Sequence, residues 1–89
     1  MKENKKIKSA TFDDVALDIQ EHLTLKTRSK GPIVFTSTQE IYGAVAEEFG
    51  AFLEVVRNND KEGIEEGLKN IIIASIRGLA SIKQNEITW

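Results

Sequence analysis

The stretch that most constrains the fold is residues 37–56, STQEIYGAVAEEFGAFLEVV. Its apolar residues recur at steps of three and four, the spacing of one face of an α-helix. This stripe consists of Ile41, Tyr42, Val45, Phe49, Phe52, Leu53 and Val56. Ser37 and Glu40 form a capping box, in which each side chain satisfies a backbone N–H of the first turn. The stretch is therefore predicted to be an amphipathic helix whose stripe faces a core.

A second amphipathic helix is predicted from Lys61 to about Lys83, after a turn over residues 57–60 in which Asn59 and Glu62 make a further capping box. Its apolar stripe consists of Ile64, Leu68, Ile71, Ile72, Ile76, Leu79 and Ile82, and Ile73 lies off that stripe. A connection this short makes two helices antiparallel neighbours, so the pair is predicted to be a long helical hairpin. Three consecutive isoleucines cannot all face one neighbour, which implies a second contact surface.

A shorter helix is predicted upstream of the hairpin. It opens at Thr11, with Asp14 completing a weaker capping box, and frays near Lys26. Residues 1–10 carry four lysines and few apolar side chains, so they are predicted to be a disordered basic arm. A single helical domain is then expected over residues 11–84, and residues 85–89 are expected to be a tail.

Residues 27–36 are predicted to connect the first helix to the hairpin. Gly31-Pro32 is the strongest helix breaker in the chain, because proline has no amide donor and glycine permits unusual dihedral angles. The apolar run that follows is too short to anchor a sheet. We expect it to lie extended over the helix ends, with Val34 or Phe35 in the core.

Composition excludes several classes of site. The chain has 89 residues, no cysteine and one histidine, which excludes disulfides, thiolate metal sites and multi-histidine centres. Twelve basic and fourteen acidic residues give no general attraction to nucleic acid or an anionic membrane, so both partners are disfavoured. Nothing resembles a signal peptide or a membrane-spanning segment. A soluble cytoplasmic protein is expected.

The short chain and the small residues in its predicted helices together predict a homo-oligomer. A chain of this length has a thin core, and the last helix is apolar on more than one side. Glycines and alanines within the predicted helices permit backbones to approach closely, either inside the hairpin or between chains. We therefore expect an all-α fold in which two hairpins form a four-helix core, as a dimer or a dimer of dimers.

Residues 33–82 carry a family resemblance. The runs FTSTQEIYGAVAEEFGAFLEVV and GLKNIIIASIR resemble the MazG-like branch of the all-α nucleoside triphosphate pyrophosphohydrolases. Small members of this family, common in bacteria and their phages, show a histidine–glutamate pair and E-E-x-x-E on one helix, and E-x-x-D on the next. The resemblance implies that the protein is located in the cytoplasm of a bacterium or of a phage-infected host cell.

The resemblance also implies a chemistry. In the family, carboxylates from two antiparallel helices hold Mg²⁺ ions, which neutralise the triphosphate and activate water for attack between the α and β phosphates. On this chain Glu47 and Glu48 match the first two glutamates of E-E-x-x-E. Glu66 lies one position from the glutamate of E-x-x-D. An active enzyme would therefore hold Mg²⁺ with Glu47, Glu48 and Glu66.

The motif departs from the family pattern at several positions. Ala51 stands where the third glutamate would be, Gly67 and Asn70 stand at E-x-x-D, and Gln39 replaces the histidine beside a retained Glu40. Fewer carboxylates should weaken binding of a hard dication severely. The competing interpretation is that the glutamates are the solvated side of an amphipathic helix pair.

Three functions follow from the resemblance and its gaps. The preferred hypothesis is a protein that has lost pyrophosphohydrolase activity and acts as a binding or assembly module. Such a module could retain a nucleotide without cleaving it, contacted by Gln39, Glu40, Arg28, Lys30, Lys69 and Asn70, the lysine and arginine side chains meeting its phosphates. The alternatives are an active enzyme with an atypical site and a regulatory protein, phage or bacterial, that acts through a protein partner.

Overall fold

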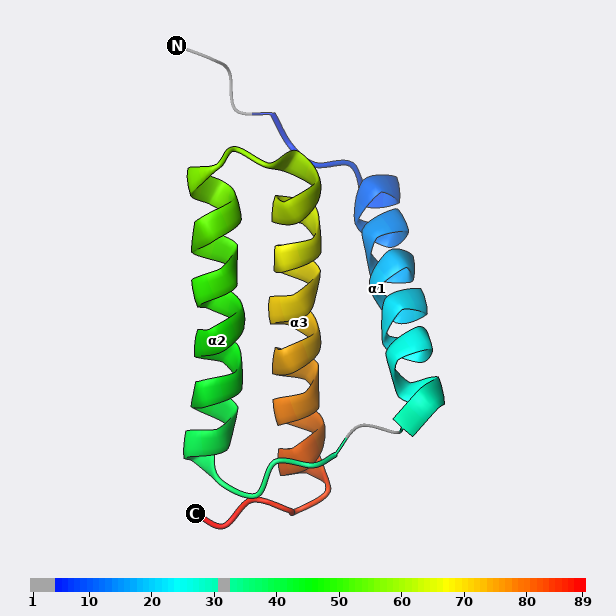
Figure 1. Ribbon diagram of the computed structural model, residues 1–89. Coiled ribbons are helices and arrows are strands. Elements are labelled where there is room, and N and C mark those ends of the chain that lie inside the picture. Colours follow the sequence, from blue (N-terminus) through cyan, green and yellow to red (C-terminus); the bar gives the residue numbers. More distant parts are fainter. Residues whose placement is uncertain (1–4, 31–32) are drawn as a thin grey trace. The chain divides into compact units, whose positions relative to one another are not determined.

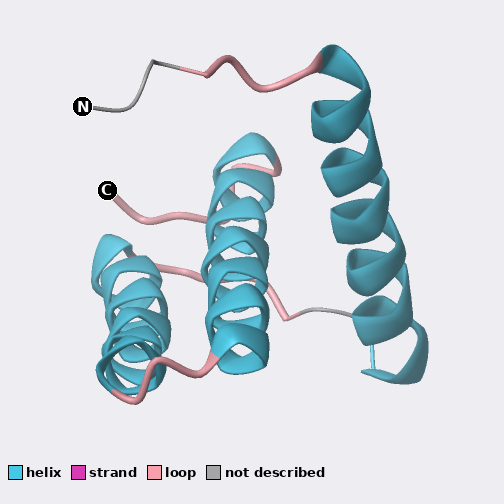
Figure 2. Ribbon diagram, turned by 90° about the horizontal axis from the view of Figure 1, so that it is seen from above, coloured by secondary structure: helices cyan, strands magenta, loops and turns pink. Residues whose placement is uncertain are grey.

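The computed structural model describes residues 5–30 and 33–89, without the side chains of residues 26–30. The described elements are helices joined by loops: α1 (Ser9–Lys30), α2 (Thr38–Arg57) and α3 (Lys61–Lys83) (Figures 1 and 2). This confirms the predicted all-α class. The chain divides into two units, Met1–Gly31 and Pro32–Trp89, and each is described by itself.

Helix α1 is longer than predicted at both ends. Its first turn is closed by the N–H groups of Thr11 and Phe12, which donate to the Lys8 carbonyl over 3.0 and 3.2 Å. The predicted start at Thr11 is therefore wrong, and residues 9 and 10 belong to the helix rather than to the arm. The predicted end near Lys26 is also wrong: α1 continues to Lys30, and residues 26–30 contain no glycine or proline that would interrupt it. The predicted breaker at residues 31–32 lies outside the described residues.

Helix α2 begins where the sequence predicts. Ser37 is its N-cap, with an extended backbone, and its hydroxyl accepts a hydrogen bond of 3.1 Å from the Glu40 N–H. The Glu40 carboxylate reaches back to accept from the N–H and the hydroxyl of Thr36, over 2.8 and 2.5 Å. The N-terminus of α2 is thus fixed by side chains that come directly before it and from its first turn.

The turn between α2 and α3 differs from the prediction in one residue. Asp60, not Asn59, is the N-cap of α3, and its carboxylate accepts from the Gly63 N–H over 3.1 Å. Asn59 instead adopts a left-handed backbone with φ 52°, which asparagine tolerates better than most residues. The tight turn makes α2 and α3 an antiparallel hairpin, as predicted (Figure 1).

Small residues of α3 receive large side chains of α2. A Cβ built on Gly67 would lie 3.1 Å from the Phe52 ring, and one built on Gly78 would lie 3.2 Å from Ile41. Ordinary side chains at these positions would hold the two helices further apart. The close approach that the sequence left open, within the hairpin or between chains, is therefore used within the hairpin at these two glycines.

The open end of the hairpin is closed by two extended segments, residues 33–37 and 84–89, which we call the end clasp. The Phe35 N–H donates to the Ser81 hydroxyl over 2.9 Å, and the Thr88 N–H donates to the Thr36 carbonyl over 2.9 Å. Phe35 and Ile87 are 4% and 8% exposed. The prediction that Val34 or Phe35 enters the core is confirmed for Phe35.

Arg77 completes the end clasp. Its guanidinium stacks on the Phe35 ring at 3.9 Å from the centroid, and its Nε donates to the Ile33 carbonyl. The C-terminal tail unwinds after α3, as expected, and it is anchored through Ile87, whereas Trp89 is 84% exposed. Within the described chain, no helix combines the length and the apolarity needed to cross a bilayer.

Candidate functional site

The position of each side chain around the hairpin follows from the contacts between its helices. Ile41 and Phe52 of α2 meet Gly78 and Gly67 of α3. A residue one position after a contact residue points about 100° further round its helix. Because α2 and α3 are antiparallel, the residues that follow these four contact residues lie on one side of the hairpin, and the residues that precede them lie on the other.

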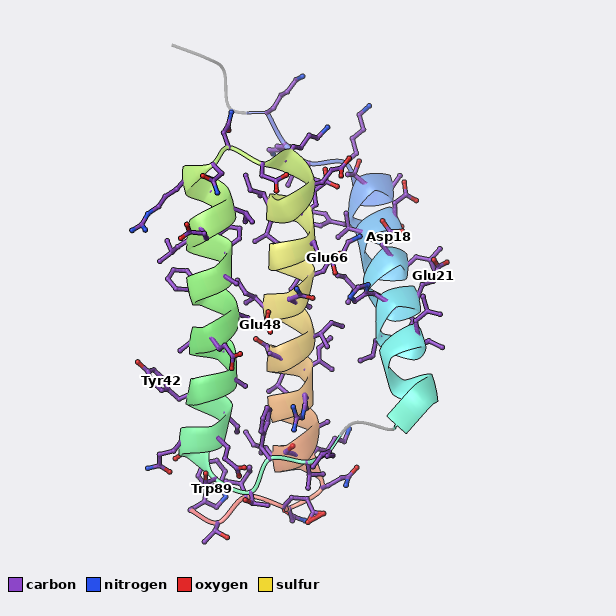
Figure 3. The ribbon with its side chains drawn as sticks, viewed as in Figure 1. Asp18, Glu21, Tyr42, Glu48, Glu66 and Trp89 are labelled. Atoms are coloured by element: carbon purple, nitrogen blue, oxygen red, sulfur yellow. The ribbon has the colours of Figure 1, made fainter. Side chains whose placement is uncertain are left out.

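The predicted metal ligands lie on the side of the preceding residues. Glu66 comes directly before Gly67, and Glu48 lies one turn before Phe52, at the junction of the two helices (Figure 3). Glu48 is half-buried, and Glu47 and Glu66 are exposed. Consecutive glutamates on a helix diverge by about 100°, so Glu47 points away from the junction that Glu48 approaches.

These carboxylates do not form a metal-binding cluster. A Mg²⁺ or Ca²⁺ site needs several oxygen ligands about 2.0–2.6 Å from one ion. Over the described residues, no group of three or more Asp, Glu, His or Cys side chains is placed to hold a metal ion. Glu47, Glu48 and Glu66 share one general side of the hairpin, but the structure does not bring them together around a common point.

Glu40 has a structural role. Its carboxylate is held by the hydroxyl of Thr36 and then by the Thr36 N–H, and these hydrogen bonds lower the pKa of Glu40, with smaller contributions from the Ser37 N–H and the charge of Arg77. The acceptor capacity of the carboxylate is directed at the helix N-terminus rather than at a ligand. The neighbouring Gln39 is exposed, and its side-chain oxygen lies 3.4 Å from the Thr38 hydroxyl.

The remaining candidates are dispersed. Lys69 and Asn70 are half-buried on α3, and as consecutive residues they diverge around the helix. The side chains of Arg28 and Lys30 lie outside the described residues. An open hollow on α1 is lined by Gln20, Glu21, Thr24 and Leu25, and none of the candidate residues with described side chains lines it. Among the described side chains, the predicted nucleotide contacts are therefore spread over the start of α2 and the first half of α3.

The other side of the hairpin carries a group of exposed apolar side chains, which we call the apolar face. It consists of Tyr42, Phe49, Leu53 and Val56 of α2 and Leu68, Ile72, Leu79 and Ile82 of α3. Four of these, Tyr42, Leu53, Leu68 and Leu79, directly follow the contact residues. Their exposed fractions run from 38% for Ile72 to 76% for Tyr42, and Figure 3 shows Tyr42 projecting outward from α2.

The apolar face corrects one prediction about α2. The stripe of α2 was expected to face a core, and this is wrong for Tyr42, Phe49, Leu53 and Val56, which are 41–76% exposed. The contacts of Ile41 and Phe52 place only one edge of the stripe against α3. The second contact surface expected of α3 stays a prediction; Leu68, Ile72, Leu79 and Ile82 of its stripe are 38–67% exposed.

No charged side chain interrupts the apolar face. Between Tyr42 and Val56 the charged residues of α2 are Glu47, Glu48 and Glu54, and between Leu68 and Ile82 those of α3 are Lys69 and Arg77. The spacing of all five places them on other sides of their helices. The phenyl rings of Phe49 and Phe52, with centroids 6.3 Å apart, connect the apolar face to the interior of the hairpin.

Comparison with known proteins adds no assignment to this geometry: no family model, no curated protein and no solved structure matches the chain. The resemblance to MazG-like pyrophosphohydrolases therefore stays a prediction from the residues that carry it.

Proposed function

We propose that this chain is a helical assembly module, which acts by binding another protein surface through the apolar face and does not hydrolyse nucleotides. The observation that carries this proposal is the exposed, uncharged surface formed by eight large apolar side chains of α2 and α3. Single exposed apolar side chains are common on soluble proteins, but contiguous groups of this kind mark interaction sites.

The size of the apolar face supports a protein partner. A fully exposed aromatic side chain has an accessible area of roughly 150–250 Å², and an aliphatic one lies at or below the lower end of that range. With exposed fractions of 38–76%, the eight side chains present on the order of 800 Å². The largest apolar patch of a typical monomer is roughly 300–600 Å². Exposure of this apolar area to water is unfavourable in free energy. Burial against a second apolar surface would remove the area from water and so favour association.

The arrangement of acids gives less support to the alternative of an active pyrophosphohydrolase. Metal-assisted phosphoryl chemistry needs ions held at fixed positions, and therefore ligands that converge. Glu47 and Glu48 diverge along α2, and Ala51 offers no third carboxylate on that helix. An atypical site would require the side chains to regroup around an ion, with an entropic cost for each one that is ordered.

Site-specific photocrosslinking tests the proposal. Benzoylphenylalanine is placed at position 42, within the apolar face, and at position 43 as a matched control. Position 43 points about 100° away from position 42 along the same helix, and the space around Gly43 is open. The proposal predicts crosslinks to polypeptide from position 42 and few from position 43.

A parallel assay addresses the enzymatic alternative. The purified chain is incubated with Mg²⁺ and a panel of nucleoside triphosphates, and pyrophosphate release is measured. The proposal predicts none above background. Equal crosslinking from positions 42 and 43, or Mg²⁺-dependent pyrophosphate release that Glu47→Ala abolishes, would overturn it.

A further inference from the structure

We infer that the partner of the apolar face is a second copy of this chain, so that two hairpins pair through their apolar faces around a two-fold axis. The inference rests on the proposed function and names the partner that it requires. It begins from the amount of apolar surface that α2 leaves uncovered: none of the residues of this helix is buried, although α3 packs along its length.

The core of the hairpin is confined to one end. In the described part of the chain, the buried side chains are Phe35 and Ile87 of the end clasp and Ser81 of α3, whose hydroxyl accepts from the Phe35 N–H. The long middle section, where Phe52 meets Gly67, has its two helices in contact but no side chain fully removed from water. Two antiparallel helices alone cannot enclose a core, and a third or fourth helix is needed to complete one.

The exposed area fits a second copy. A stable protein interface buries roughly 800 Å² on each partner, which is the order of the area that the apolar face presents. A two-fold interface uses the same surface on both chains, so each apolar face meets a surface of equal length and equal apolar character. The result is a four-helix core built from two hairpins.

The absence of charge from the apolar face permits this pairing. A two-fold axis places like surfaces together, so a charged residue within the face would approach other side chains of the interface and lose its water. Within the stretches 42–56 and 68–82, the charged side chains lie on other sides of the helices: Glu47, Glu48, Glu54, Lys69 and Arg77. They would remain at the rim or on the outer surface of the pair, where solvent screens them.

Sedimentation equilibrium of the 89-residue chain tests the inference, with concentration varied across roughly 1–100 μM because association depends on mass action. The wild-type chain is expected to sediment as a dimer, or as a tetramer that contains this dimer. Leu79→Glu places a charge within the apolar face at a residue that is 67% exposed in the hairpin. It is expected to weaken pairing by about a hundredfold or more.

Ala80→Glu is the matched control. It introduces the same charge at the next residue of α3, which is exposed and points about 100° away from Leu79. It is expected to leave the association constant within about threefold of the wild-type value. Tyr42→Glu tests the face from α2, at a side chain 76% exposed, so the inference does not depend on the folding of one variant.

The outcomes separate the inference from the proposed function. Loss of association in Leu79→Glu and Tyr42→Glu, but not in Ala80→Glu, supports both. A monomeric wild-type chain overturns the inference, whether the apolar face is covered by residues 9–30 of the same chain or by a different protein. In the latter case crosslinks from position 42 to that protein would leave the proposed function standing. An oligomer unaffected by either face variant also overturns the inference.

Discussion

Ser81 is almost fully buried, at 1% exposed, and its hydroxyl joins two parts of the hairpin. The hydroxyl accepts from the Phe35 N–H over 2.9 Å and donates to the Arg77 carbonyl over 2.8 Å. A methyl group at this position would leave the buried N–H of Phe35 without its acceptor. Such a loss costs more than the net contribution of an ordinary hydrogen bond, because the donor is not returned to water.

Ser81→Ala is therefore expected to lower the free energy of unfolding by about 1–3 kcal/mol. Ser75→Ala is the control, since the Ser75 hydroxyl donates only to the Ile71 carbonyl of its own helix, and it should change stability by less than about 0.5 kcal/mol. Urea unfolding followed by circular dichroism measures both. Equal effects of the two substitutions would mean that the hydrogen bond to Phe35 does not stabilise the end clasp.

The ionisation of Glu40 makes the stability of the fold depend on pH. Its pKa lies below the ordinary glutamate value of 4.5, chiefly because the Thr36 hydroxyl and N–H donate to the ionised carboxylate. A carboxyl group whose pKa is lower in the folded state stabilises that state above its unfolded pKa. The stabilisation is lost as the pH falls through the folded pKa.

Glu40→Gln is therefore expected to destabilise the hairpin at pH 7 and to have a smaller effect as the pH is lowered below about 4.5. The measurement is the difference in unfolding midpoint between wild type and variant along a pH series. A difference that stays constant from pH 7 to the acid end would show that ionised Glu40 contributes nothing to the capping of α2.

At the scale of elements, the glycines of the hairpin fall into two classes. A Cβ on Gly63 would lie 2.5 Å from the Asp60 carboxylate and 2.7 Å from a methyl group of Val55, so it would disturb both the cap of α3 and the contact with α2. Gly43 has open space around it. In a helix, glycine is less stable than alanine where no contact favours the smaller residue.

Gly63→Ala is expected to destabilise the fold by about 1–3 kcal/mol, and Gly43→Ala is expected to stabilise it by about 0.8–1 kcal/mol. Thermal or urea unfolding of the two variants checks the opposite signs. Stabilisation by Gly63→Ala would mean that Asp60 and Val55 yield at little cost, and that the close packing at this turn is not required.

Much of the hairpin could be predicted from sequence because its signals are local. The capping residue Ser37 and the turn formers near Asn59 act within a few residues, and they placed the starts of α2 and α3 correctly. The choice between Asn59 and Asp60 as the cap of α3 could not be made from the sequence. Both are turn residues, and only the backbone decides which takes the left-handed conformation and which accepts from Gly63.

The buried edge of α2 was harder to predict. Apolar residues from Ile41 to Val56 span a wide arc of the helix, and periodicity alone does not show which edge of the arc meets a partner. The decision is made by α3, where Gly67 and Gly78 admit Phe52 and Ile41. The consecutive isoleucines of α3 were the available signal that further apolar surface would remain uncovered.

At the scale of the whole molecule, the hairpin has two unlike sides. One carries Glu48 and Glu66, which the resemblance to pyrophosphohydrolases made candidates for a metal site, and the other carries the apolar face. The sequence could predict which residues are candidate ligands, from their types and spacing. It could not predict whether their carboxylates converge, because that depends on how the helices pack. The apolar face depends on the same packing, which leaves these side chains outside the junction of α2 and α3.

Thermal melting of the 89-residue chain compares the two sides of the hairpin most directly. The melting temperature is recorded across a range of protein concentrations, with and without Mg²⁺ and a nucleoside triphosphate. Any partner that binds only the folded state raises the melting temperature by mass action. Pairing through the apolar face predicts a melting temperature that rises with protein concentration and is unchanged by Mg²⁺ and nucleotide. A melting temperature that is independent of protein concentration and rises with Mg²⁺ and nucleotide would contradict it.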